Sequence, residues 1–137
     1  MKKIHIFLIF TLFSLLITNK LSAQLDTLNY LKQFEANKAN YINQPFSKLL
    51  NDMTQIQPKT IWSYSGGRVK TKTIGSRLKF STMDLSFNNV ITLLVYWQDP
   101  IPRDQTKYYE QKNSFYFTSE EKNFYGSNIV KDVIVYR

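Results

Sequence analysis

The feature that most constrains the fold is a change in the spacing of apolar residues at Pro58. Before Pro58, apolar residues recur every three or four positions, which is the spacing of one face of a helix. After Pro58 they recur at every second position, which is the spacing of a strand with one buried face. Helices gathered at one end of mostly adjacent strands predict an α+β fold, in which an antiparallel sheet is covered on one face.

Two helices are expected before Pro58. Asp26 is a suitable N-cap for a helix over residues 27–40. A second helix would carry a narrow apolar stripe of Phe46, Leu49, Leu50 and Met53. Pro45 precedes this stripe, and proline suits the first helical position, so we expect it to start the helix with Gln44 or Asn43 as the cap. The stripe indicates core packing rather than a site.

Four to five strands are expected after Pro58, separated by glycine, asparagine and proline turns. The candidate strands are residues 60–64, 68–74, 77–85, 90–97 and 129–136, with a further short one at 115–117. Residues 99–104 are expected to form a loop, because two prolines two positions apart suit neither strand nor helix. Thr118 and Glu121 have the spacing of a capping box, which predicts one short helix before the last strand, ending at Gly126.

The N-terminus has the layout of a secretory signal peptide. Two lysines precede an apolar run over residues 4–17, and Ala23 supplies a small residue for cleavage. As a helix, this run would span about 21 Å, short of the ~30 Å core of a bilayer. We therefore expect residues 1–23 to be removed and residues 24–137 to form one small domain without a transmembrane segment. The destination would be the periplasm or the exterior of the cell.

The composition excludes several kinds of catalytic and metal-binding site. The chain has no cysteine, and its one histidine, His5, lies in the expected signal peptide. A mature chain without either residue cannot form a Ser-His-Asp triad or a Cys-His pair. It also offers no imidazole or thiolate to zinc, copper or haem. We therefore expect no catalysis, no cofactor and no metal.

A basic stretch is the first candidate site. No acid occurs between Asp52 and Asp84, and the mature chain keeps 15 of the 18 basic residues against 10 acidic ones. The candidate residues are Arg68, Lys70, Lys72, Arg77 and Lys79. On adjacent strands they would attract phosphates, acidic glycans or lipid headgroups. Alternatively, they are a solvated strand face or an edge that blocks pairing between sheets. Nucleic acid is not expected, because the chain carries an export signal and no nucleic-acid-binding motif.

Aromatic residues are the second candidate site. Trp62, Tyr64, Tyr96 and Trp97 would line a groove for a sugar or a peptide, because Trp and Tyr combine a flat apolar face with a polar tip. The alternative is ordinary packing in the core and on the sheet, where aromatic residues are common.

These observations favour a small exported binding or interaction protein without catalysis, whose ligand the sequence does not identify. One alternative is an inhibitor or immunity-type protein that blocks one specific protein, using buried aromatic anchors. A further alternative is a small hydrolase that uses Asp99, Asp104 and Glu110, although nothing in their spacing indicates a catalytic pair. Ser76 and Lys79 match the S-x-x-K motif of penicillin-binding enzymes, but they lie in a predicted strand and the partner motifs are missing.

Overall fold

The computed structural model describes residues 26–67 and 69–137. The predicted signal peptide and Arg68 lie outside these residues. The described chain is built around one sheet of four strands in the order β1-β2-β3-β4. The strands are β1 (Thr60–Tyr64), β2 (Lys72–Lys79), β3 (Thr92–Pro102) and β4 (Val130–Tyr136). Each strand pairs antiparallel with its neighbour in sequence. The predicted α+β class and antiparallel sheet are confirmed.

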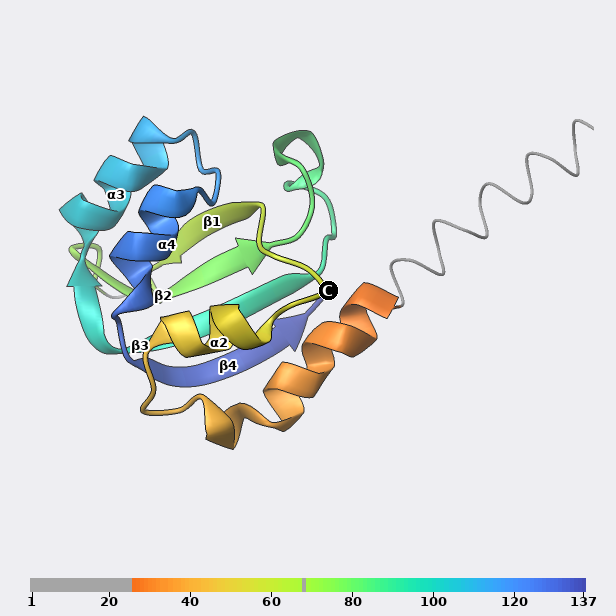
Figure 1. The fold of residues 1–137 in the computed structure, drawn as a ribbon. Helices are drawn as coiled ribbons and strands as arrows, with labels where there is room; N and C mark the ends of the chain where they lie inside the picture. The colour runs from red at the N-terminus through yellow and green to blue at the C-terminus, as the bar shows by residue number, and fades with distance from the viewer. Residues whose placement is uncertain (1–25, 68) are drawn as a thin grey trace, which may run out of the picture.

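The helices lie before the sheet and before its last strand. A helix over residues 26–36 comes first. It is followed by the 3₁₀ turn η1 (Lys38–Asn40), α2 (Phe46–Asp52), the 3₁₀ turn η2 (Met83–Leu85), α3 (Arg103–Lys112) and α4 (Ser119–Gly126). In Figure 1, α2 and α4 cross the same side of the sheet, and the first helix runs beside β4. The sheet is thus covered on one face.

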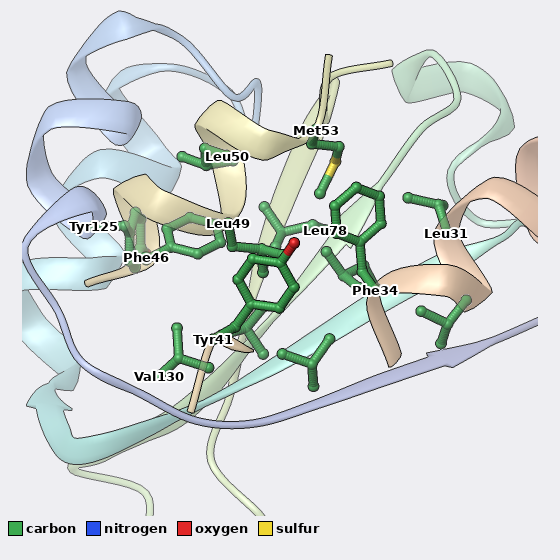
Figure 2. Packing of buried hydrophobic residues seen from close by; sticks show 14 of the residues in the cluster. Leu31, Phe34, Tyr41, Phe46, Leu49, Leu50, Met53, Leu78, Tyr125 and Val130 are labelled. Atoms are coloured by element: carbon green, nitrogen blue, oxygen red, sulfur yellow. The ribbon is translucent and has the colours of Figure 1, made fainter. Parts of the chain in front are cut away.

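The core lies between these helices and the sheet. All four residues of the predicted α2 stripe are at most 1% exposed, which confirms that the stripe packs in the core. Figure 2 shows these side chains between the first helix, the sheet and Tyr125 of α4. Pro45 starts α2 as expected, but it occupies the N-cap itself, with φ −59° and ψ 142°, one residue before the predicted position.

The strands between residues 65 and 85 differ from the prediction. The β1–β2 turn includes residues 70 and 71, so residues 69–71 of the alternating segment are not strand. β2 then runs without a break through Gly75 and Ser76, with an irregularity in its pairing between Thr73 and Gly75. Residues 83–85 form η2 rather than strand. An alternating pattern of basic and apolar residues predicts a strand only if one face is buried, and Val69 is 48% exposed.

The segment after Trp97 also differs. Residues 99–102 are not a loop, because β3 continues to Pro102 and α3 begins at Arg103. The register of β2 against β3 jumps from Gly75–Tyr96 to Thr73–Ile101, so the two prolines lie around an irregularity, where strands tolerate them. The helix before β4 is preceded by a second one, α3. The capping box at Thr118 and the helix ending at Gly126 are confirmed.

Candidate functional site

One face of the sheet has no α-helix packed on it in the described part of the chain. Strand pairing places every second residue of each strand on this side, which we call the open face. Its members are Thr60, Trp62 and Tyr64 of β1, Gly75, Arg77 and Lys79 of β2, Thr92, Leu94 and Tyr96 of β3, and Asp132, Ile134 and Tyr136 of β4. The intervening residues, such as Leu78, Leu93 and Val133, belong to the core under the helices.

The two edges of the sheet are closed. On the outer edge of β4, the Val135 amide donates to Glu35 Oε1 at 3.0 Å, and Lys32 Nζ donates to the Val135 carbonyl at 2.5 Å. On the outer edge of β1, the Ile61 amide donates to the Phe115 carbonyl and the Ser63 amide to Glu110 Oε1, at 2.9 and 2.6 Å. These partners block strand addition. The part of the sheet that remains available to a ligand is therefore the open face, except for its buried members Thr60, Gly75, Thr92 and Leu94.

Trp62 holds a lysine at one end of the open face. Lys79 Nζ lies 5.3 Å from the Trp62 ring centroid and donates a hydrogen bond to the Ser86 carbonyl. Phe115 stacks against Trp62 at 4.1 Å with an interplanar angle of 17°, and Phe87 meets it edge-on at 5.3 Å. Phe115 has φ +64°, a conformation that costs a bulky residue about 1–2 kcal/mol. The backbone is therefore strained at the residue whose side chain supports Trp62.

Tyr64 holds an arginine beside this lysine. The Arg77 guanidinium carbon lies 4.6 Å from the Tyr64 ring centroid. Tyr64 also meets Tyr96 edge-on at 5.9 Å, although the two residues are on strands that are not neighbours. They meet because Gly75, which pairs with both, has no side chain between them. Stacking on a ring fixes the guanidinium while leaving its N–H edges free to donate.

The electrostatics of this pair are unfavourable for the isolated protein. Arg77 and Lys79 are two residues apart on the same side of β2, and neither joins an ion pair among the residues described. Burial, and then the charge of Arg77, lower the pKa of Lys79. Asp132 is the one acid among the open-face residues, and it pairs with Lys38 at 2.7 Å. An anion bound between Arg77 and Lys79 would relieve this repulsion.

The structure brings the two candidate sites of the sequence together, but not all of their residues. Trp62, Tyr64, Tyr96, Arg77 and Lys79 share the open face. The other members lie elsewhere: Lys70 in the β1–β2 turn, Lys72 at the exposed start of β2, Arg68 outside the described residues, and Trp97 in the core. Trp97 is 2% exposed, and its indole stacks on Tyr125 at 5.7 Å and donates to Ser76 Oγ.

The three candidate carboxylates are not gathered around a cleft. Glu110 is 4% exposed and is held by Arg103 at 2.8 Å and by the Ser63 amide. Asp99 and Asp104 are exposed, at the end of β3 and in the first turn of α3. Glu110 therefore ties α3 to β1. The motif residues Ser76 and Lys79 point to opposite faces of β2, because they are three positions apart in a strand.

Several residues of this site carry no local sequence signal. Phe87 was assigned to no site, yet it is 75% exposed beside Trp62. Leu94, Ile134 and Tyr136 complete the open face and were read only as strand residues. Finding them requires the strand register, which a single sequence does not specify.

No protein-family model matches the chain, and no curated protein or solved structure is significantly similar to it. Across residues 26–67 and 69–137, His, Cys, Asp and Glu form no group of three or more that could hold a metal ion. No helix in those two ranges is long and apolar enough to cross a membrane.

Proposed function

We propose that the protein is a small exported binding protein, without catalysis, that recognises an anionic partner through the open face of its sheet. The observation that carries this proposal is the pair Arg77 and Lys79. Two cations lie side by side, each stacked on an aromatic ring, and neither has a carboxylate partner in the described structure. A fold that needed only solubility would gain more from separated charges.

The surroundings of the two cations favour recognition over simple solvation. Stacking removes much of the conformational freedom that a free arginine or lysine loses on binding, so the entropy cost of binding is reduced. Tyr96 and Tyr136 add hydroxyl groups, while Leu94 and Ile134 supply an apolar floor between them. This combination suits a partner with anionic groups on a partly apolar body.

The size of the open face bears on the alternative of an inhibitor or immunity-type protein. Four strands and three residues along each give an outline of roughly 20 Å by 20 Å, or about 400 Å². The accessible area is smaller, because Thr60, Gly75, Thr92 and Leu94 are buried. A stable interface between two proteins buries about 800 Å² on each partner. The open face alone is therefore better matched to a polymer segment, a headgroup or another small anionic group than to a whole protein.

The test is retention of the purified protein on immobilised dextran sulfate, measured by elution in a salt gradient. We compare an Arg77→Gln/Lys79→Gln variant with a Lys107→Gln/Lys122→Gln variant, which removes the same charge from exposed positions on α3 and α4. Loss of two charge-assisted contacts of about 1.5 kcal/mol each should weaken binding about a hundredfold. The control should elute close to the unmodified protein. Equal elution of the two variants would show that the open face does not bind the polyanion.

A further inference from the structure

The loop that connects β2 to β3 carries exposed apolar side chains beside the cationic end of the open face. This loop, residues 80–91, contains η2. Phe87 is 75% exposed and Leu85 is 49% exposed, and both are among the few large apolar residues that the described chain leaves in solvent. Phe87 touches the edge of Trp62, so this apolar tip adjoins the open face directly.

The same end of the sheet carries the cations and the amphipathic aromatic residues. Lys79 anchors the loop through the Ser86 carbonyl. Across the sheet from Lys79, Thr92 pairs with Tyr136, which is 39% exposed. Asp84 is the one acid of residues 80–91. This end of the molecule thus combines an apolar tip, Trp and Tyr rings with polar ends, and two cations without an acidic partner among the residues described.

We infer that residues 80–91 and the adjoining open face form a docking surface for a membrane that contains anionic lipids. Lipid phosphates would lie against Arg77 and Lys79, while Leu85 and Phe87 would enter the boundary between headgroups and acyl chains. Trp and Tyr side chains favour this boundary, which is apolar on one side and wet on the other. This inference rests on the proposed function, because it names the source of the anion.

Two observations favour a lipid surface over other occupants. A second copy of the chain would bring the Arg77 and Lys79 pairs of both copies together, so like charges oppose a symmetric dimer through this face. A soluble anionic polymer would satisfy the cations, but it would leave Phe87 and Leu85 exposed. A membrane satisfies both at once, and its two-dimensional surface requires no shape-matched partner.

The test is co-sedimentation of the purified protein with vesicles at low salt. One set contains phosphatidylcholine alone, and the other contains phosphatidylglycerol mixed into phosphatidylcholine. We compare Leu85→Ser/Phe87→Ser with Val69→Ser, which removes one apolar side chain about as exposed as Leu85, 48% against 49%, at the opposite end of the strands. Circular dichroism verifies that each variant is folded, and all proteins are also run on dextran sulfate.

We expect the unmodified protein to bind the anionic vesicles and not the neutral ones. Leu85→Ser/Phe87→Ser should weaken vesicle binding by about tenfold or more, because it removes two apolar side chains that would leave water when the protein binds the membrane. It should weaken retention on dextran sulfate much less than vesicle binding, because Arg77 and Lys79 remain, and Val69→Ser should change neither. Retention on dextran sulfate without vesicle binding, or equal vesicle binding by the two variants, would overturn the membrane inference while the proposed function stands. If the unmodified protein bound neither anionic vesicles nor dextran sulfate, the membrane inference and the proposed function would both be overturned.

Discussion

Replacing Gly75 with alanine should destabilise the protein strongly, and it tests how the fold creates the open face. An added Cβ at Gly75 would lie 2.7 Å from the Val95 carbonyl oxygen and 3.4 Å from Leu94 Cδ1. Favourable contacts between non-bonded carbon atoms lie at about 3.5–4.0 Å, so the contact with the carbonyl is severely short. Because that oxygen belongs to the backbone of β3, it cannot turn aside as a side chain would.

The expected magnitude follows from this rigidity. Overpacking a well-packed site costs about 1–3 kcal/mol, and a clash with the backbone of the neighbouring strand belongs at the upper end of that range. We therefore expect Gly75→Ala to lower the free energy of unfolding by about 3 kcal/mol. For a chain of this size, that corresponds to a fall in Tm of roughly 10 °C. The new methyl group would also separate Tyr64 from Tyr96, so polyanion binding should fall in the protein that remains folded.

The assay is urea unfolding followed by circular dichroism, with Gly126→Ala as the matched control. Gly126 ends α4, and its added Cβ would meet only Ser47 Cβ, at an ordinary 3.7 Å. Alanine favours helix over glycine by about 0.8–1 kcal/mol, so this variant should be neutral or slightly more stable. Of these two glycine-to-alanine substitutions, only the one at Gly75 should destabilise the protein. A Gly75→Ala variant within about 0.5 kcal/mol of the unmodified protein would show that β2 and β3 are not packed as described.

Three further predictions concern stability. Tyr125 is fully buried, and its hydroxyl makes no hydrogen bond of good geometry, although the hydroxyls of Ser63 and Ser76 lie near it. Tyr125→Phe should therefore change the free energy of unfolding in urea by less than about 1 kcal/mol. Burial, and then the charge of Glu110, raise the pKa of Tyr125. The stability that its neutral phenol contributes should be complete below about pH 10 and lost at higher pH. In a pH series, Tyr125→Phe should therefore show less alkaline destabilisation than the unmodified protein. Thr118→Ala removes the capping box of α4 and should lower the unfolding free energy by about 1 kcal/mol in the same assay, whereas Ser127→Ala, just past the end of that helix, should change it little.

Much of the fold follows from local patterns in the sequence. The α2 stripe, β1 and the α4 capping box each combine a clear period with a start or stop signal, and each lies where the sequence predicts it. The predictions for residues 69–71 and 99–102 were wrong for one shared reason. Alternation and proline content describe what a segment tolerates, whereas the register between β2 and β3 decides whether it is paired.

The candidate site was predictable in its residue types but not in its membership. Tyr96 and Trp97 are consecutive strand residues, whose side chains alternate between the two faces, so the prediction that both line one groove was wrong for a reason already present in the sequence. The contact between Tyr64 and Tyr96 could not be predicted from the sequence. It depends on Gly75 lying between them on β2, and therefore on two pairings that are distant in the chain. The support of Trp62 by Phe115 was equally hidden, because Phe115 reaches it from the segment after α3.

The same glycine offers a structural explanation for the tyrosines, since aromatic rings that cover a strand glycine protect its backbone. That explanation accounts for Tyr64 and Tyr96, but it does not account for the cations. An alkyl side chain at position 79 would fill the space over Trp62 without the desolvation that lowers the pKa of Lys79, and without the repulsion from Arg77. Solubility does not require the pair either, because exposed positions such as Lys107 and Lys122 carry charge without opposition. The cation–π contacts of both residues and the hydrogen bond from Lys79 to Ser86 offset this burial and repulsion only in part, and the proposed anion would complete their environment.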